Sequence, residues 1–577
     1  MFRIDKFRSG LIVLLMGTIV FYFGLRRIWL SDILTLASSI QDDSFYYLLP
    51  GWFVSRVGFF SFDGATKTYG FQPLYEILIS LLGVGASDVG QLLRSALTLN
   101  LILHVLTGGV IYIIARSISA SFLAKGFQNF CGILAATFWY VNMPLYLSQL
   151  TGKENALASL LLSIVLLSYF RAKLNNFSSN RWVIAFGFFT GLLAITRIHP
   201  SAIFIISLLW VSIIRMNIST KKPEILPLAW SLIAFLAPIL AWGLYAESEF
   251  NQFMPTSGLV KMGNNRAAIF SNILNPIFWH EAFDYIANSV QFSLGLDSNF
   301  HFPQPESQSL HNHHFTFEWP DNLIRSTIFI LSFLGAMYGV TLTRGRILLP
   351  IPCLVMASLL GHLLTFTLLK HRGEMYYYIW YIFDLPVVIS LSLGLGIGCL
   401  AQLLQCLSVS PLSEKTPEFI FTYNSEMPSN RQTGLVAGCL LSIVIVFISA
   451  KQFKPFEKFS SDPADWQNVM IQAGLKVKNN PTLDPEAKVV AWSSGALGFL
   501  MPGRVINLDG LANDEVLKAR RMGKSEADVI LSLGKAYFVD LHPNFLGDKR
   551  LSSHLIDKVP FPAMGDYYIY EISTSSQ

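Results

Sequence analysis

Two adjacent carboxylates, Asp42 and Asp43, lie in the stretch 41–47, between the first apolar segment and a long loop rich in aromatic residues. Acidic side chains this close to lipid are costly and usually mark a functional site. A carboxylate can accept the proton of an attacking hydroxyl group, and a low-dielectric neighbourhood readily shifts its pKa. We therefore interpret the pair as a general base with a helper or metal ligand. Alternatively, an aspartate ahead of an amphipathic helix caps the helix N-terminus, and one aspartate can cap while the other reacts.

Further charged residues stand at the ends of apolar segments. Lys153 and Glu154 begin one segment, and Arg197 with His199 closes another. In the functional interpretation Glu154 is a second acid, and the basic side chains contact an anionic lipid phosphate. Alternatively, the basic side chains extend to the headgroups and Glu154 is stabilised by a helix N-terminus. The same alternatives apply to three other basic residues, Arg56, Lys261 and Arg372.

Aromatic and histidine clusters add two weaker hypotheses. Tyr376, Tyr377 and Trp380 open a late apolar segment, where they form either an interfacial aromatic belt or a wall for a prenyl chain or sugar ring. An upstream loop is rich in histidine, which is typical either of metal binding or of an exposed, disordered loop. Its histidines are His301, His311, His313 and His314.

The composition is that of an integral membrane protein. Of the 577 residues, 52% are hydrophobic and 14% are charged, whereas an ordinary soluble domain has about 25% charged residues. The mean hydropathy is +0.47. The net charge of +5 is explained by basic cytoplasmic loops, so we expect no nucleic-acid partner. The five cysteines show no CxxC spacing, which argues against a disulfide framework or a zinc site.

Eleven apolar stretches are long enough to cross a bilayer. Arg26 and Arg27 follow the first without a convincing cleavage site, so we expect a retained span rather than a signal peptide. The odd number of spans places the two termini on opposite sides of the membrane. The predicted spans cover residues 10–26, 92–116, 127–147, 153–170, 181–197, 200–215, 226–246, 322–342, 347–369, 377–404 and 433–450.

The distribution of basic residues predicts the orientation. Arg116, Arg171 and Arg215, each with a nearby lysine, fall in loops on one side of the predicted membrane. Cytoplasmic loops carry an excess of Lys and Arg, so this side is predicted to be cytoplasmic. The acidic pair, the polar ends of the spans, the loop at about 247–321 and the C-terminal tail then lie outside.

The chain divides into a transmembrane domain at 1–450 and a polar region at 451–577. The first external loop, at about 27–91, is too long for a simple connection. Within it we expect helices at 32–40 and 46–60 that lie in the plane of the interface, followed by a turn and a further helix.

Alternation of apolar residues in the tail predicts a small external α/β domain. We expect strands at 488–492, 503–508 and 536–541, an edge strand at 567–572 and a helix at 515–533. No G-x-G-x-x-G, P-loop or nucleophile-elbow motif occurs.

The arrangement resembles the GT-C class of polytopic membrane glycosyltransferases, which includes the protein O-mannosyltransferases and the bacterial lipid A aminoarabinose transferases. The resemblance rests on the acidic pair in the first external loop, on 70–75 (Gly-Phe-Gln-Pro-Leu-Tyr), on 255–258 with Lys261, and on 507–513 (Asn-Leu-Asp-Gly-Leu-Ala-Asn). It covers the whole chain in layout and individual motifs in sequence. Several relatives have Asp-Glu where this chain has Asp-Asp.

The resemblance implies an enzyme of the bacterial plasma membrane. It implies transfer of a sugar, with inversion, from a polyprenyl-phosphate carrier to a glycan, lipid or protein acceptor at the external face. By motif, Asp42 matches the first acid and general base, and Asp43 the second acid, a helper or contact to a divalent metal. Lys261, Arg197 and Arg372 are our own candidates for the carrier phosphate.

Two other functions stay open. A transporter or flippase for a lipid-linked sugar predicts polar or broken helices near the bilayer midplane, often in paired halves. A membrane-anchored scaffold that presents the tail to cell-wall components predicts that the acidic pair is dispensable.

Overall fold

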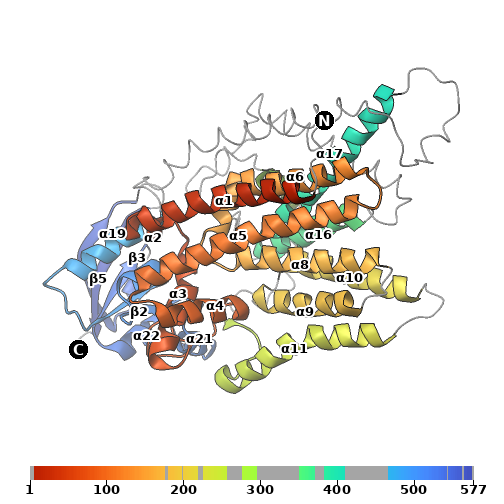
Figure 1. Cartoon of the computed structure of the whole chain (residues 1–577). Helices are drawn as coiled ribbons and strands as arrows, with labels where there is room; N and C mark the ends of the chain where they lie inside the picture. Colours follow the sequence, from red (N-terminus) through yellow and green to blue (C-terminus); the bar gives the residue numbers. More distant parts are fainter. Residues whose placement is uncertain are drawn as a thin grey trace.

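A bundle of long helices with a mixed α/β domain packed against one end makes up the computed structural model of the chain (Figure 1). The structure describes residues 6–175, 180–197, 199–218, 225–256, 276–294, 350–370, 382–409, 466–541, 544–561 and 565–574.

The bundle contains the apolar helices of the chain. Within the described residues, six helices are long and apolar enough to cross a membrane. They cover 7–30, 89–119, 155–174, 225–250, 350–367 and 385–403. Shorter apolar helices cover Pro73–Gly85, Asn180–Thr196 and Pro200–Arg215. The helices are α1 (Lys6–Leu30), α5 (Val89–Ser119), α6 (Lys125–Val141), α7 (Met143–Gln149), α8 (Asn155–Leu174), α9 (Asn180–Thr196), α10 (Pro200–Ile218), α11 (Ile225–Phe250), α14 (Pro276–Leu294), α16 (Pro350–Lys370) and α17 (Leu385–Val409).

One predicted span is broken. The segment 127–147 forms α6 and α7, which meet at an angle of 67°. The side chain of Asn142 caps α7 by accepting from the N–H of Leu145, and Pro144 stands in the first turn of α7. The predicted spans 322–342 and 433–450 lie outside the described residues, so the total of eleven spans stays a prediction.

Close helix packing in the bundle depends on small residues. A Cβ atom at Gly187 of α9 would overlap the backbone oxygen of Ser231 in α11, and one at Gly191 would overlap that of Phe235. In lipid, helices associate through such close contacts because there is little hydrophobic drive to bring them together. The Gly-x-x-x-Gly spacing therefore forms a seam between α9 and α11.

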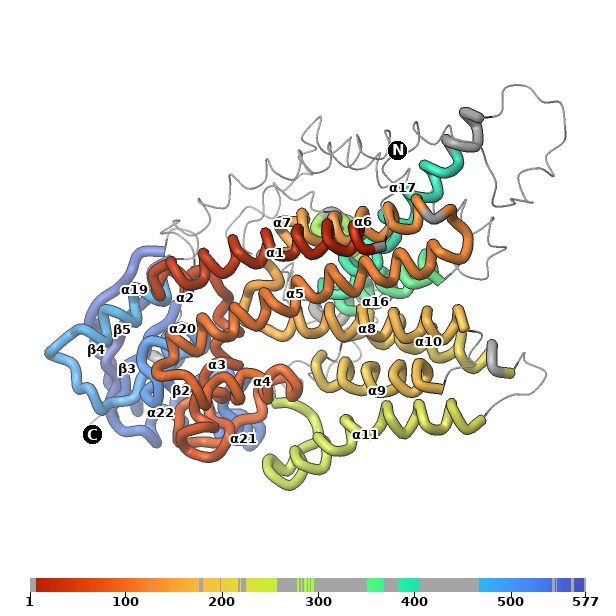
Figure 2. Tube along the Cα trace, in the orientation of Figure 1, coloured from red at the N-terminus to blue at the C-terminus, as the bar shows by residue number. Residues whose placement is uncertain are grey.

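The first loop folds into helices, as predicted. It contains α2 (Ile33–Ser38), α3 (Asp42–Val57) and α4 (Pro73–Gly85). Pro73 stands at the start of α4, where its missing N–H costs no hydrogen bond. Figure 2 shows α3 beside the C-terminal domain, and α4 packs against α3 at the same end of the bundle.

The C-terminal domain is built on a five-stranded sheet of order β2-β1-β3-β5-β4. The first three strands in this order are parallel, and β5 and β4 are antiparallel to their neighbours. The strands are β1 (Lys488–Ala491), β2 (Val505–Asn507), β3 (Ala536–Asp540), β4 (Leu551–Val559) and β5 (Tyr567–Thr574). The helices are α19 (Trp466–Asn479), α20 (Gly495–Leu500), α21 (Asp514–Arg521), α22 (Glu526–Leu533) and the 3₁₀ turn η4 (Asn544–Gly547).

Two details of the predicted tail are wrong. The strand at 567–574 lies inside the sheet, and β4 forms the edge instead. The predicted helix at 515–533 is two helices, separated by Gly523, whose φ of 78° interrupts a right-handed helix. The four predicted strands are present.

The two parts of the molecule share one hydrophobic core. A continuous cluster of buried apolar side chains runs from Leu49 in α3 through Leu497 in α20 to Val489 in β1. A second, smaller cluster lies on the other face of the sheet, around Phe538. The shared core fixes the C-terminal domain against the loop that carries the acidic pair.

Candidate active site

The carboxylate of Asp42 is bound by the C-terminal domain. Its Oδ1 accepts a hydrogen bond from the N–H of Ala496 at 2.8 Å, and its Oδ2 accepts one from the N–H of Gly495 at 3.1 Å. Both N–H groups belong to the first turn of α20, where backbone donors are unpaired and favour a negative charge. Asp42 does not cap its own helix, because the N-cap of α3 is Gln41, whose side chain makes no cap hydrogen bond.

Tyr46 extends this contact into a network. Its hydroxyl donates to Asp42 Oδ2 at 3.1 Å and accepts from the N–H of Ser494 and from Asn507 Nδ2, both at 3.4 Å. Asn507 Nδ2 also donates to Ser494 Oγ at 2.9 Å. Asn507 belongs to the motif 507–513, so two of the stretches that carry the sequence resemblance meet at this hydroxyl.

The environment of Asp42 raises the pKa of its carboxyl group to about 6. Burial is the main cause, and the nearby charge of Asp43 acts in the same direction. The hydrogen bonds from Ala496, Gly495 and Tyr46 oppose the rise because they stabilise the charged form. A carboxyl group with such a pKa can exchange a proton near neutral pH.

Asp43 lies in a different environment from its neighbour. Its side chain is 36% exposed, and its Oδ2 lies 3.1 Å from Nζ of Lys153, which is almost fully buried. Gly152 precedes Lys153 and has a φ of 73°, so the chain turns there. The side chain of Ser44 in α3 lies against this turn. The structure thus brings one carboxylate to the C-terminal domain and the other to the start of α8.

A second ion pair lies beside the first. Nη1 of Arg197 is 2.6 Å from Oε1 of Glu154 and 2.7 Å from Oδ1 of Asn155. Both side chains of the pair are about 5% exposed. Breaking a buried pair by removing one partner leaves an uncompensated charge, so loss of either residue alone is expected to be strongly destabilising.

The remaining predicted site residues divide into two groups. Arg56 lies near the other end of α3, about 20 Å from Asp42 at the rise of an α-helix. Its guanidinium donates to the carbonyl groups of Trp52 and Ala86 and covers the ring of Trp52. The others, Lys261, Arg372, Tyr376, Tyr377 and Trp380, lie outside the described residues, as do the histidines of 301–314.

The other family-like stretches converge on the same junction. Oδ1 of Asp514 accepts from the N–H of Tyr69 at 3.2 Å and from the hydroxyl of Thr256 at 2.6 Å. The N–H of Thr256 in turn donates to the carbonyl of Tyr69 at 2.8 Å. A Cβ atom at Gly70 would overlap the carbonyl oxygen of Leu511, which explains glycine at that position. The loops around 69–75, 255–256 and 507–514 therefore contact one another.

Several buried polar atoms near the acids have no hydrogen-bond partner in the described part of the chain. They are the side-chain amide atoms of Gln41, Oγ of Ser44, Oε1 of Gln72 and Oε2 of Glu154. Buried polar groups are nearly always paired, with protein, water or ligand.

No group of three or more His, Cys, Asp or Glu side chains within the described ranges is arranged to hold a metal ion. The candidate metal ligands proposed from the sequence are Asp42 and Asp43. The three donors around Asp42 occupy most of its lone pairs, so Asp43 is the more suitable of the two for a metal contact.

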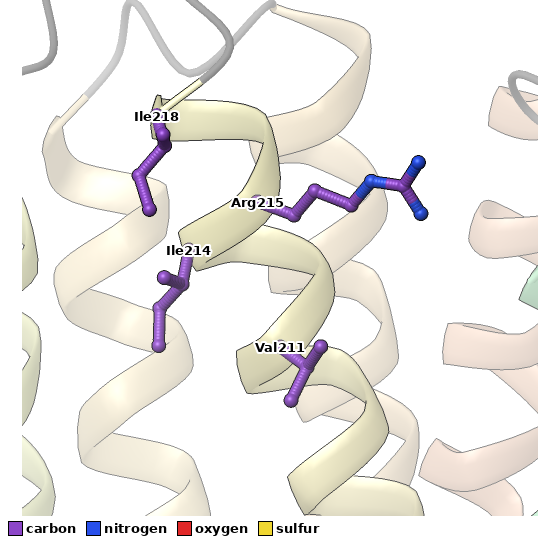
Figure 3. Close-up of a pocket in the computed structure, with 4 residues that line it drawn as sticks. All are labelled: Val211, Ile214, Arg215 and Ile218. Carbon is purple, nitrogen blue, oxygen red and sulfur yellow. The ribbon is translucent and has the colours of Figure 1, made fainter.

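A pocket of about 440 Å³ lies elsewhere, on the last turns of α10 (Figure 3). It is lined by Val211, Ile214, Arg215 and Ile218. The three aliphatic side chains are exposed, as is typical of a surface that faces lipid. The pocket contains no carboxylate and lies at the end of α10 remote from Arg197, so it is not part of the acidic site.

The sequence interpretation missed Tyr46, Gly495 and Ser494 as members of the site. Tyr46 was inside the motif around the acids, and its i, i+4 spacing from Asp42 could have indicated that the two side chains meet. Gly495 and Ser494 had no such signal, because their role depends on how the tail packs against α3.

Comparison with known proteins identifies the fold. No protein-family description matches the chain, and no curated protein matches it by sequence. ArnT from Cupriavidus metallidurans bound to undecaprenyl phosphate is similar in structure, with a TM-score of 0.54 and 13% identity over 96% of this chain and 97% of that chain. Its apo form gives a TM-score of 0.56 at 12% identity over 97% of both chains. The polytopic fold of the GT-C class, expected from the sequence, is thereby confirmed.

Proposed function

We propose that this chain is an inverting glycosyltransferase that moves a sugar from a polyprenyl-phosphate carrier to an acceptor. The observation that carries the proposal is the ion pair of Asp43 with the buried Lys153, beside the carboxylate of Asp42 that the C-terminal domain binds, in a fold shared with ArnT.

The reaction is a single displacement. The acceptor's nucleophilic oxygen attacks the anomeric carbon, and the bond between that carbon and the phosphate oxygen breaks. The proton of the acceptor passes to a carboxylate of the acidic pair, and the polyprenyl phosphate leaves with the bonding electrons. Such a step needs a base and positive charge near the leaving group, but no enzyme nucleophile.

The environments of the two acids suit complementary roles. Asp42 has the raised pKa expected of a general base. Asp43 is the more accessible carboxylate and pairs with Lys153. We assign proton transfer to Asp42, with Asp43 as its partner and as the contact for a divalent metal if one is bound.

Positive charge comes from the ends of two helices. Lys153 stands just before α8 and Arg197 just after α9, and both are buried although each carries a charge. Donor phosphate is the ligand class that best matches them, because it can accept hydrogen bonds from both ammonium and guanidinium groups. Glu154 orients Arg197.

We further propose that the site faces the outside of a bacterial plasma membrane. Lys153 pairs with Asp43, so α8 begins at the acidic site and its last turn, with Arg171 and Lys173, lies at the opposite end. α10 likewise begins beside Arg197 and ends with Arg215. Positive charge gathered at that end favours a cytoplasmic location for it.

The test uses the full chain purified in detergent and a panel of polyprenyl-phosphate sugars. Release of polyprenyl phosphate that requires Asp42 and Asp43 is the expected result. Loss of a general base lowers such rates about 100- to 10,000-fold, so Asp42→Asn is expected to fall in this range. Asp557→Asn, at an exposed ion pair with Lys476, is the matched control.

Two results would contradict the proposal. One is release at the wild-type rate from both Asp42→Asn and Asp43→Asn. The other is no release from any donor by a folded wild-type protein that instead moves lipid-linked sugars across proteoliposome membranes, as a transporter would.

A further inference from the structure

A third carboxylate, from the C-terminal domain, stands next to the acidic pair. Asp509 follows β2, and its Oδ1 accepts a hydrogen bond from the N–H of Leu511 at 2.7 Å. Asn507, two residues earlier, donates to the hydroxyl of Tyr46 at 3.4 Å. Tyr46 donates to Asp42, so the loop that carries Asp509 is linked to the first acid through Asn507 and Tyr46.

The backbone that carries Asp509 is held from both sides. Within the domain, the N–H of Ala512 donates to Oδ1 of Asn507 at 3.1 Å. Towards the bundle, Leu511 lies directly against Gly70, and Asn513 Nδ2 contacts Oδ2 of Asp63 at 3.4 Å. Asp509 therefore keeps a fixed position relative to α3, which is what a substrate-binding group requires.

The electrostatics differ on the two sides of the site. Burial is the main cause that raises the pKa of Asp509 to about 7, and the charges of Asp43 and Asp42 act in the same direction. The cations Lys153 and Arg197, by contrast, belong to the ends of bundle helices. The cations thus belong to the bundle, where Asp43 and Glu154 pair with them, whereas Asp509 belongs to the C-terminal domain.

We propose that Asp509 binds the acceptor, through hydroxyl groups of a sugar-like molecule, and holds it beside the acidic pair. The inference rests on the proposed function. A lipid-linked donor approaches along the bundle, where the cations are, so the acceptor takes the side that the C-terminal domain covers. A carboxyl group with one oxygen held by the backbone can exchange hydrogen bonds with hydroxyls through the other.

The experiment separates donor chemistry from acceptor binding. Purified full chain is supplied with a donor found active in the panel, and polyprenyl phosphate release is measured with water alone and with increasing acceptor. For Asp509→Asn, the acceptor KM is expected to rise about tenfold or more, as for loss of a hydrogen bond to a charged group. Release in water alone is expected to stay within about twofold of wild type.

The controls make the result specific. Asp528→Asn changes a carboxylate of the same domain that pairs with Arg550 at the surface, and it is expected to leave both rates unchanged. Asp42→Asn is expected to lower release with and without acceptor, because it removes the base for either nucleophile. An unchanged acceptor KM in Asp509→Asn, or an equal loss of release in water, would overturn the assignment.

Binding without turnover keeps the inference testable if the donor class is wrong. Tryptophan fluorescence is measured with a panel of methyl hexosides and methyl pentosides, since Trp492 lies in the network around Asn507 and Tyr46. Binding by wild type that is lost in Asp509→Asn and kept in Asp528→Asn supports the inference even when no donor is cleaved. Equal binding by both variants, or none by wild type, contradicts it.

Discussion

The carboxylate of Asp42 accepts a 2.8 Å hydrogen bond from the N–H of Ala496, a residue 454 positions later in the chain. The proposed base of the membrane domain is thus oriented by the first turn of a helix in the C-terminal domain. The tail is therefore a structural part of the candidate site, and changes in α20 should affect catalysis directly.

Gly495→Ala tests this dependence. A Cβ atom at Gly495 would overlap the backbone oxygen of Asp42 and approach its carboxyl carbon to 2.9 Å, so α3 and α20 must separate. We expect kcat to fall about 100-fold, since a displacement near 1 Å at a reacting group has an effect of that order. Gly547→Ala, where a Cβ meets nothing within 4 Å, is the control. Wild-type kcat in Gly495→Ala, with folding intact, would show that Asp42 needs no support from α20.

The pH dependence of turnover should report the raised pKa of Asp42. A general base acts when it is deprotonated, so kcat/KM, which reports the free enzyme, is expected to rise with pH through a pKa of about 6 rather than near 4. The pKa of the coupled Asp509 lies nearby, so the acidic limb belongs to the group of carboxylates and not to one residue alone. A limb centred near pH 4 would contradict the burial of Asp42.

Stability should change with pH in the opposite sense to that of most aspartates. The pKa of Asp42 is about 6 in the folded protein and 3.8 as a free side chain. Between these values the folded state holds a proton that the unfolded chain has released, so stability falls as the pH rises from about 4 to 6. Thermal unfolding of wild type and Asp42→Asn across this window is the measurement, and the variant is expected to show the smaller fall.

Arg197 and Glu154 should behave as a coupled pair. Arg197→Gln leaves a buried carboxylate without its partner and is expected to destabilise the protein by about 3–5 kcal/mol. Adding Glu154→Gln removes that charge and should restore part of the loss. Arg215→Gln, at the far end of α10, is the control for loss of a basic side chain. Additive effects of the two changes in thermal unfolding would argue against the pair.

The seam between α9 and α11 gives a prediction for the bundle alone. Gly187→Ala and Gly109→Ala make the same change within a helix, but only the former places a Cβ against a neighbouring backbone, that of Ser231. We expect Gly187→Ala to be the less stable of the two by about 1–3 kcal/mol, the usual cost of overpacking. Equal melting temperatures in detergent would show that the seam opens freely.

The sequence was most informative where function and membrane topology act together. Asp43, Lys153 and Arg197 are far apart in the chain, yet each stands at the end of an apolar segment on the same predicted side. Because spans fix their ends at one of two surfaces, such residues are brought near one another by topology alone. Their grouping around the acidic pair follows this expectation.

The sequence was least informative where packing decides the structure. The binding of the Asp42 carboxylate by the first turn of α20 depends on a tertiary contact that no local pattern encodes. The edge strand β4 was missed because most of its residues face solvent, which removes the alternation that marks a strand. Asp509 stood in a recognised motif, but its position beside Asp42 required the docked domain.

The distance in sequence between Asp42 and Ala496 also has a consequence for how the protein is made. At about 5–20 residues per second, the ribosome needs roughly half a minute to a minute and a half to synthesise the chain between them. During that time α3 is already at the membrane while its carboxylate lacks the amide donors of α20. The nascent protein thus completes its acidic centre only when its last segment is made. In a chain truncated before α20, the carboxylate of Asp42 would stay without these donors.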